Sequence, residues 1–434
     1  MRISSRSVLQ VLLAVLLSVS SPLWAQSHNE RPSVPLQDLL SGPDRQDFPW
    51  KITVLQPRLM YQQRFIVQMR ARISAEVVSA HEGKHVLHFI LKVKPQDGDW
   101  LKGEQYNDYP IPADLGSGKE IEYATGVYFH PGNYTLALIA FESNGNRISV
   151  AHRDVRVEAV KDDPFPELDQ YVPTVEFPNG FPDQEVGADN LSNGELFPVA
   201  HLDEWVPIKN EQPVLVDIVL NITKRAELPV LEPPRFDRPY PRNRTGMVWA
   251  KPVQPTYRLD VGRVLQMGNV LAHLGLSSGC VRVSAIDVLR MKTIADRANE
   301  KTLDWDKFEQ QIEKFDQNTV DAGVLANKKG PAQFAHRFLG SLSEDAKGCP
   351  GAARHYVIVV GHEVSLPGGA KEEKLEAVDA ERAKFYYVHG GISSMGDDLG
   401  EILKGAKPEK LPFTNPREFR KSFKRIVDDL RTGK

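Results

Sequence analysis

The chain has 434 residues, of which 41% are hydrophobic and 26% charged, and its formal net charge is −3 at pH 7. This composition is that of a globular protein with enough apolar material for two or three domains. A net charge so close to zero gives no reason to expect nucleic acid or an anionic membrane surface as a partner. The two cysteines, Cys280 and Cys349, can form one disulfide. They are too few for a disulfide scaffold or, by themselves, for a zinc site.

A secretory signal peptide is predicted over residues 1–25. Two arginines precede an apolar run from Val8 to Val19, and the small residue Ala25 closes the segment. A basic region, a short apolar core and a small-residue exit form the pattern of an export signal. The run is shorter than the roughly 20 apolar residues of a membrane-spanning helix, and no later segment approaches that length. We therefore expect a secreted or periplasmic protein without a membrane span, in which the polar residues 26–49 form a tether.

Residues 50–160 are predicted to form an all-β domain. Runs rich in β-branched and aromatic residues, such as VLHFILKV (86–93) and NYTLALIAFE (133–142), have the length of strands. No helical stripe interrupts them, and clusters of Gly, Asn and Pro separate the later ones. Several short antiparallel strands over roughly 110 residues fit an immunoglobulin-like sandwich of two sheets.

A proline-rich linker is predicted over residues 161–212. Its first half carries five prolines, and each proline lacks a backbone donor and disfavours both helices and central strands. We expect an extended segment that lies on a domain surface through Phe165, Tyr171 and Phe177.

From residue 213 to 434 helical and strand patterns alternate. The run VLVDIVLNI (214–222) is almost continuously apolar, as expected for a strand covered on both faces. A helical repeat of apolar residues follows at 261–274, and residues 280–298 indicate two adjacent strands. Two further helices, two buried strands and a C-terminal helix are predicted at 305–315, 331–346, 355–361, 384–391 and 415–431. This alternation predicts a doubly wound α/β sheet with helices on both faces.

In this order of elements the second half of the chain resembles a von Willebrand factor A-type domain. The resemblance extends from about Pro213 to Leu430, roughly half the chain. An exported β-sandwich followed by a proline-rich linker and such a domain also resembles a group of bacterial secreted proteins. The resemblance implies a non-enzymatic binding or adhesion protein whose partner is a protein or a cell-surface glycan.

The family pattern also implies where a divalent cation would bind. The family has Asp-x-Ser-x-Ser directly after the first strand and an aspartate after the fourth strand. Here the corresponding residues are Asn221, Thr223 and Arg225 after the first strand, and Gly361 and His362 after the fourth. A hard cation needs at least one carboxylate to offset its dehydration. We therefore expect a degenerate site without a metal, and no cofactor, in which Asn221, Thr223 and Arg225 contribute to ligand binding.

Three other polar residues belong to the same comparison. The loop threonine of the family pattern is assigned to Thr319, with Asp321 beside it. Asp217 lies inside the first strand, four positions before Asn221, which is too early for a metal ligand. We expect Asp217 to mark the start of the strand or to form a buried bond.

A long insertion separates the first strand from the helix that follows it. Residues 226–257 contain seven prolines and four aromatic side chains, Phe236, Tyr240, Trp249 and Tyr257. Ligands of doubly wound sheets bind outside the carboxyl ends of the strands, which is where this insertion is expected. Aromatic side chains on a stiff frame favour a peptide-binding or glycan-binding surface. The alternative is a stiff solvated loop.

The segment SSGCVR (277–282) is also similar to the active-site motif of L,D-transpeptidases, whose cysteine is acylated by peptidoglycan stem peptides. That resemblance implies Cys280 as a thiolate nucleophile with a histidine base, for which His273 is the candidate. The usual upstream His-Gly pair is absent, and the match covers only this short segment. We favour a structural role for Cys280, with a cell-wall cysteine acyltransferase as the alternative.

A disulfide between Cys280 and Cys349 is expected from the A-type order of strands. Cys280 begins the second strand and Cys349 precedes the fourth, so that both lie at the starting ends of strands that flank the first. One strand lies between the two positions, so we expect a modest reach of the loop before the fourth strand to close the gap.

Overall fold

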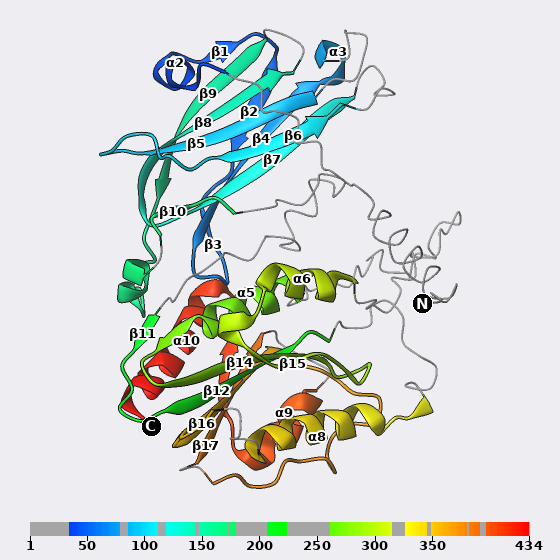
Figure 1. Cartoon of the computed structure of the whole chain (residues 1–434). Helices are drawn as coiled ribbons and strands as arrows, with labels where there is room; N and C mark the ends of the chain where they lie inside the picture. The colour runs from blue at the N-terminus through cyan, green and yellow to red at the C-terminus, as the bar shows by residue number, and fades with distance from the viewer. Residues whose placement is uncertain are drawn as a thin grey trace, which may run out of the picture.

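The structure is a computed structural model, and it describes residues 34–78, 86–111, 119–143, 147–171, 173–178, 206–223, 261–314, 326–344, 349–379, 382–390 and 396–433. Within these residues the chain is rich in β-structure and forms two domains, a β-sandwich and a sheet with helices on both sides (Figure 1). The predicted signal peptide, the aromatic insertion with Tyr240, Trp249 and Tyr257, and the residues Arg225, Thr319 and Asp321 lie outside the described residues.

The N-terminal domain consists of two antiparallel sheets. The first sheet has the order β1 (Arg45–Gln46), β9 (Ile148–Val157), β8 (Gly132–Glu142), β5 (Val86–Pro95) and β6 (Gln105–Pro110). The second has the order β10 (Val175–Glu176), β7 (Glu120–Phe129), β4 (Phe65–Ser74) and β2 (Trp50–Val54), and β3 (Arg58–Leu59) also pairs with β4. A short helix, α3 (Ala75–Val78), follows β4.

The two sheets face each other across one apolar core. Phe89 of β5 stacks on Tyr123 of β7, with ring centroids 3.8 Å apart and an interplanar angle of 5°. Alternate residues of both sheets, among them Val67 and Leu138, point into the same core. This inward and outward alternation is the periodicity that a sandwich requires. The all-β domain predicted from the sequence is therefore a pair of packed antiparallel sheets.

The expected tether over residues 26–49 requires a correction. From residue 34 the chain is part of the sandwich: α2 (Leu36–Ser41) packs Leu39 and Leu40 against the outer face of the first sheet, and β1 pairs with β9. Phe48 is completely buried in the sandwich core. The segment is polar and contains prolines, so its composition did not reveal that Leu39, Leu40 and Phe48 are buried.

Part of the segment expected to be a linker also has regular structure. Residues 161–178 include a short 3₁₀ helix, η1 (Pro166–Tyr171), and the strand β10. Phe165 and Leu168 are fully buried, whereas Tyr171 and Phe177 are partly buried against the cores of the two domains. Further on, β11 (Val206–Ile208) pairs in parallel with β13 (Leu274–Leu276). The prolines reduce the number of backbone hydrogen-bond donors in this segment. Its aromatic side chains nevertheless pack against the apolar cores.

The second domain is built on a six-stranded sheet. Its order is β15 (Lys292–Asn299), β14 (Gly279–Asp287), β12 (Val214–Asn221), β16 (Arg354–His362), β17 (Ala383–Gly390) and β18 (Glu409–Phe413). The five strands from β14 to β18 in this order are parallel to one another, and the edge strand β15 is antiparallel to β14. The two strands predicted within residues 280–298 therefore pair as neighbours.

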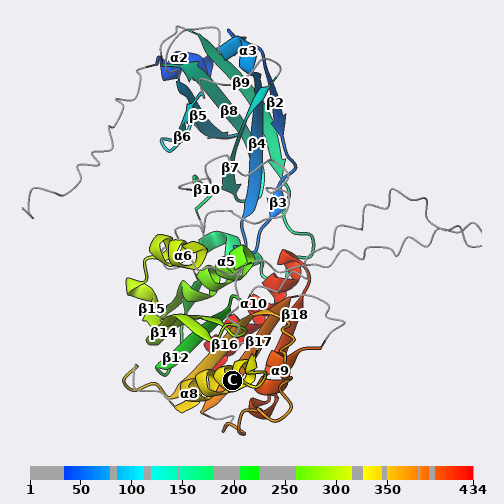
Figure 2. The ribbon, with the colours of Figure 1, turned by 90° about the vertical axis from the view of Figure 1, so that its right-hand side faces the viewer.

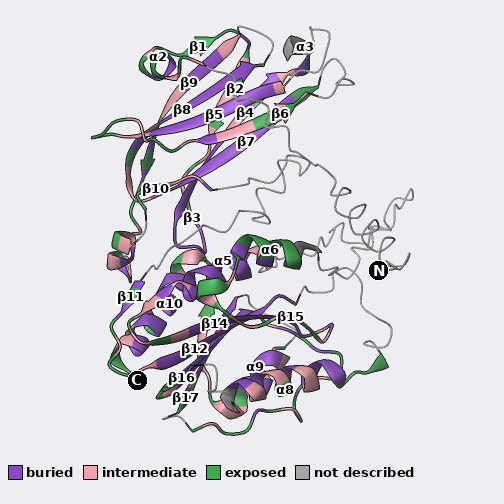
Figure 3. Ribbon diagram, viewed as in Figure 1, coloured by how far each residue is buried: buried purple, intermediate pink, exposed green. Residues whose placement is uncertain are grey.

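Helices cover both faces of this sheet (Figure 2). The first face packs against α5 (Val261–Ala272), α6 (Trp305–Lys314) and α10 (Pro416–Thr432), and the second against α8 (Gly330–Glu344) and α9 (Asp398–Leu403). The short 3₁₀ helices η2 (Glu300–Thr302) and η3 (Lys404–Ala406) complete the connections. Strand β12 is buried over its whole length, as its apolar run predicts (Figure 3).

The two faces of β12 contribute to different cores. Val216, Ile218 and Leu220 contact the cluster under α5 and α10, whereas Val219 contacts the cluster under α8 and α9. Helix α5 approaches the strand closely because Gly268 has no side chain, and a Cβ atom there would lie 2.6 Å from a methyl carbon of Leu220.

Cys280 and Cys349 form a disulfide, as the order of strands predicts. Their Cα atoms are 5.8 Å apart, and 69 positions separate them in sequence. Cys280 lies opposite Leu215 of β12, and Cys349 lies in the turn that leads into β16. The bridge therefore links the two neighbours of β12 at the starting end of the sheet.

One cluster of buried apolar residues joins the two domains. Tyr61 and Tyr128 at the end of the sandwich belong to the same cluster of buried residues as Phe165, Phe419 and the sheet beneath α10. The ring of Tyr61 is 5.5 Å from that of Phe413 in β18. Burial of aromatic surface on this scale favours a fixed arrangement of the two domains.

Candidate functional site

The carboxyl ends of the parallel strands bring together the two described residues that the sequence marks for ligand binding. Asn221 is the last residue of β12 and is completely buried. Its Oδ1 atom accepts hydrogen bonds from the Thr223 hydroxyl at 2.5 Å and from the Thr223 amide at 3.2 Å. The Thr223 hydroxyl oxygen in turn accepts from the Val288 amide at 2.8 Å. These oxygens therefore close the turn after β12 and join it to the segment after β14.

The neighbouring strand β16 approaches Asn221 through a glycine. A Cβ atom on Gly361 would lie 2.8 Å from the Asn221 Cβ atom, so the two strand ends are packed too closely for a side chain at residue 361. The sheet order changes direction between β12 and β16, because the chain runs outward to β14 and β15 on one side and to β17 and β18 on the other. Asn221 and Gly361 thus flank the topological switch point, where open α/β sheets bind their ligands.

The carboxylates nearest to this edge are paired within the protein. Asp287 at the end of β14 is completely buried and lies 2.7 Å from Arg290. Burial raises the pKa of the Asp287 carboxyl, although hydrogen bonds from Arg290 act in the opposite direction. Asp397 accepts a hydrogen bond from the Tyr387 hydroxyl at 3.0 Å and caps α9 through the Gly400 amide.

A histidine and a glutamate also lie at this edge. His389 of β17 lies 3.6 Å from a carboxylate oxygen of Glu363 and stacks on Tyr387, with ring centroids 4.7 Å apart. Burial lowers the pKa of His389. Among the residues that the structure describes, no group of three or more His, Cys, Asp or Glu side chains is arranged to hold a metal ion.

Three residues of the segment that resembles a transpeptidase motif have structural roles. Cys280 is bonded to Cys349, so that a thiolate would require reduction of this bridge. Gly279 has a φ of 129°, and a Cβ atom there would overlap the carbonyl oxygen of Val214. The Ser277 hydroxyl donates to the Asn210 side chain at 2.9 Å. Each of these residues is therefore explained by the start of β14 without reference to catalysis.

The candidate base, His273, follows directly after α5. Its Nδ1 atom donates to the carbonyl oxygen of Asn269 at 2.7 Å, and its ring lies 5.9 Å from that of Trp305. These contacts hold the imidazole against the helix that precedes it and against α6.

A buried charge network at the other end of the sheet was not predicted as a unit. Asp217 of β12 accepts two hydrogen bonds from Arg282 of β14, from Nε at 2.7 Å and from Nη2 at 2.6 Å. His355 of β16 places its Nε2 atom 2.7 Å from the second oxygen of the same carboxylate. The three side chains are at most 8% exposed. Burial alone would raise the pKa of Asp217, but the hydrogen bonds from His355 and Arg282 hold it below its usual value.

The pairing of Asp217 with Arg282 could in part have been predicted from the sequence. Asp217 and Arg282 are opposite charges that each interrupt an apolar strand, and in the parallel register the two residues lie directly opposite each other. The buried bond expected for Asp217 is therefore present. The contribution of His355 could not be inferred, because it depends on the register of a third strand.

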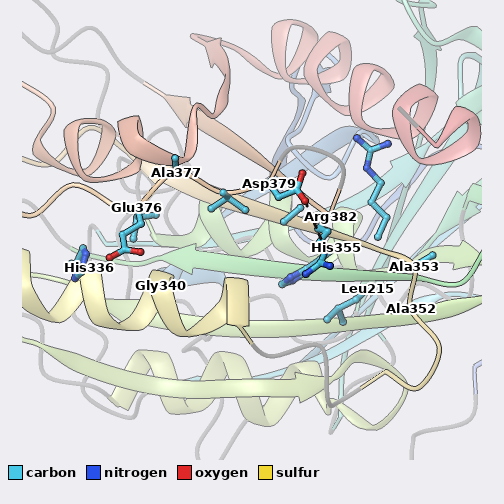
Figure 4. A pocket seen from close by; sticks show the side chains of 14 residues that line it. Leu215, His336, Gly340, Ala352, Ala353, His355, Glu376, Ala377, Asp379 and Arg382 are labelled. Atoms are coloured by element: carbon cyan, nitrogen blue, oxygen red, sulfur yellow. Dashed lines mark ion pairs between the residues drawn. The ribbon is translucent and has the colours of Figure 1, made fainter.

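A cavity of about 640 Å³ lies next to this network, at the starting ends of the strands (Figure 4). Leu215 and His355 lie in its floor, whereas Gly340 of α8 and the segment around Val378 form its walls. This cavity lies at the end of the sheet opposite to Asn221 and Thr223.

Comparison with known proteins provides no family for the chain. No family model and no curated protein matches it. Among solved structures, the ApaA protein of Bordetella pertussis is 15% identical, with 26% of this chain and 97% of that chain covered and a TM-score of 0.18. A protein from Archaeoglobus fulgidus is 7% identical over 25% of this chain and 98% of its own, with a TM-score of 0.18. A Bacteroides uniformis β-glucuronidase is 9% identical over 84% of this chain and 39% of its own, with a TM-score of 0.19. Likenesses this weak carry no information on the function of this chain.

The helices of the described residues were also compared with the requirements of a membrane span. Not one of them combines the length and the apolar character that crossing a bilayer demands.

Proposed function

We propose that this chain is an exported, non-enzymatic binding or adhesion protein. In this proposal its second domain is a von Willebrand A-type domain that binds its ligand without a metal, and its first domain is an immunoglobulin-like sandwich. The observation that carries the proposal is the closure of Asn221 on Thr223 at the switch point of the sheet. Asn221 occupies the position at which the family has a charged metal ligand. Its side-chain oxygen accepts hydrogen bonds from the hydroxyl and the backbone amide of Thr223.

The order of the sheet supports the choice of domain. One antiparallel edge strand, five parallel strands and helices on both faces agree with the order of elements from which the resemblance was inferred. Beside the buried Asn221, the partly buried His362 and Glu363 at the end of β16 provide hydrogen-bonding groups rather than a concentrated negative charge. Such an edge suits a protein or glycan ligand, which presents donors and acceptors together.

The disulfide supports an exported location. Disulfides persist in oxidising compartments, and the predicted signal peptide would direct the chain to one of them. The same bridge supports the structural role of Cys280 over the alternative of a cysteine acyltransferase, because a nucleophilic cysteine must be available as a thiolate.

The proposal is tested by retention of the mature protein on envelopes of its own cell. Retention should be unchanged by a chelator and should fall at least tenfold in the variant His362→Glu, which adds a negative charge at the end of β16. The matched control is Arg337→Glu on the exposed face of α8, which should be retained like the wild type. Loss of retention in the chelator, with recovery on adding magnesium, would contradict metal-independent binding. Equal retention of the two variants would contradict binding at the carboxyl edge.

A further inference from the structure

Asn221 carries one oriented hydrogen-bond donor at the carboxyl edge of the sheet. Its Oδ1 atom accepts from the backbone amide of Thr223, and because an amide N–H only donates, this contact distinguishes the oxygen from Nδ2. Nδ2 lies 3.2 Å from the position that a Cβ atom of Gly361 would take. Within the described residues no group accepts a hydrogen bond from Nδ2, although Asn221 is completely buried. Buried donors in proteins normally have an acceptor, so this nitrogen marks a place for one.

His389 provides a second polar atom from the other side of Gly361. In the parallel register Gly361 lies opposite His389 of β17, and its neighbour in β12 is Asn221. Asn221 and His389 follow Val219 and Tyr387 by two residues, and both of these pack on the second face of the sheet. The two polar side chains therefore lie on that face with only a glycine between them. The Nδ1 atom of His389 is buried and, in the part of the chain that the structure describes, forms no hydrogen bond.

A carboxylate lies beside His389 and limits the charge of an occupant. Glu363, two residues after Gly361, places its Oε1 atom 3.6 Å from Nδ1 of His389. The side chains of His389 and Glu363 are 11% and 17% exposed, so this side of the arrangement reaches solvent. An anion would be repelled by Glu363, and a cation cannot accept a hydrogen bond from Asn221. A neutral group that both accepts and donates fits these contacts best.

From these contacts we infer that the ligand of the carboxyl edge is a neutral glycan, one of whose hydroxyl groups binds between Asn221, Glu363 and His389. The hydroxyl oxygen accepts from Nδ2 of Asn221, while its proton is donated to the Glu363 carboxylate. A hydroxyl can also donate to or accept from His389, so the assignment does not depend on the protonation state of the imidazole. Sugars present hydroxyls around the whole ring, whereas protein ligands are usually anchored by aromatic or arginine side chains. This inference rests on the binding function proposed for the carboxyl edge and selects one of the two classes of partner named there.

Treated envelopes distinguish a glycan from a protein ligand. Retention of the mature protein is compared on untreated envelopes, on envelopes oxidised with periodate, which cleaves the vicinal diols of sugars, and on envelopes digested with a protease. We expect periodate to reduce retention at least tenfold. Retention that survives periodate would overturn the inference while leaving the binding function intact, and its loss after protease digestion would then assign a protein ligand. No retention on untreated envelopes would instead refute the binding function, and this inference with it.

Two variants locate the hydroxyl group. Asn221→Asp keeps the oxygen bound by Thr223 but replaces the donor by a second acceptor, and Glu363→Gln removes the charge without changing the size of the side chain. Each should lower retention at least tenfold, because each weakens a hydrogen bond to the hydroxyl. The assay contains a chelator, which prevents a metal from binding to the new carboxylate. The matched control is Asn133→Asp at an exposed position of β8, which should be retained like the wild type. Wild-type retention of Glu363→Gln would contradict the site even if Asn221→Asp did not fold.

Discussion

Arg420, in the second turn of α10, forms an ion pair of 2.6 Å with Asp163, and its side chain is completely excluded from solvent. The same guanidinium donates to the carbonyl oxygen of Phe165 at 3.0 Å and lies 3.2 Å from Asp169. The three acceptors belong to the segment between the domains, whereas Arg420 belongs to the last helix of the chain. This contact therefore connects the sandwich to the sheet through its connecting segment.

Replacing Arg420 should destabilise the protein and uncouple its two domains. In Arg420→Met the Asp163 carboxylate loses its buried partner, and breaking one side of a buried pair costs about 3–5 kcal/mol. We expect urea unfolding, followed by fluorescence and circular dichroism, to change from one transition to two. The control Lys404→Met breaks a pair with Glu401 in which the lysine is 62% exposed, and it should cost no more than about 1 kcal/mol. A single transition in both variants, with equal loss of stability, would show that Arg420 does not couple the domains.

The charge network across three strands gives a second prediction. Asp217→Asn leaves the buried Arg282 without its counter-charge and should lower the free energy of unfolding by about 3–5 kcal/mol. The double variant Asp217→Asn, Arg282→Met removes both charges and should recover part of that loss. Asp306→Asn, at an exposed position in the first turn of α6, serves as the control. A loss in Asp217→Asn no larger than in the control would mean that the network contributes little to stability.

The same carboxylate predicts how stability depends on pH. The pKa of Asp217 is lowered in the folded state, because the hydrogen bonds from His355 and Arg282 outweigh the effect of burial. Its contribution is therefore fully present above the unfolded pKa of about 3.9 and is lost as the pH falls through the lower folded pKa. The difference in unfolding free energy between the wild type and Asp217→Asn should be largest at neutral pH and should shrink below about pH 4. If the difference in unfolding free energy grew on acidification, the pKa of Asp217 would be raised in the folded state rather than lowered.

The sequence predicted the interior of the sheet better than its margins. The almost continuously apolar run of β12 indicated burial on both faces, and Asn221 and Thr223 lie at the carboxyl end of this strand. Strand β18 and helix α9 have only five and six residues, and β18 contains Pro412. Segments so short show too little periodicity to be recognised from the sequence.

Features made from distant segments could not be predicted. The cavity beside His355 requires the starting ends of three strands, one helix and a connecting segment at once. Residues 34–49 and Phe165 dock on surfaces that are formed elsewhere in the chain. The disulfide could be predicted because it required only the order of three strands, which the resemblance to an A-type domain implied.

Removing the disulfide should reduce stability without removing function. The bridge closes a loop of 69 residues, which stabilises the folded state by about 4 kcal/mol in the chain-entropy model. Cys280→Ser with Cys349→Ser should therefore unfold at a lower temperature but should still be retained on envelopes when it is tested well below that temperature. Titration of thiols in the unfolded, non-reduced wild type should find none. Cross-linking of cell-wall peptides by the wild type, absent in the double variant, would instead identify Cys280 as a nucleophile.

The most direct test of metal-independent binding is the melting temperature of the mature protein with and without millimolar magnesium or manganese. A cation near Asn221 would lose water without gaining a carboxylate, so the account predicts no change in Tm. A specific ion present at 100 times its dissociation constant would add about 2.7 kcal/mol, which corresponds to a rise of several degrees. A rise of that size, lost in the variant Asn221→Ala, would contradict the account and assign a metal to the carboxyl edge of the sheet.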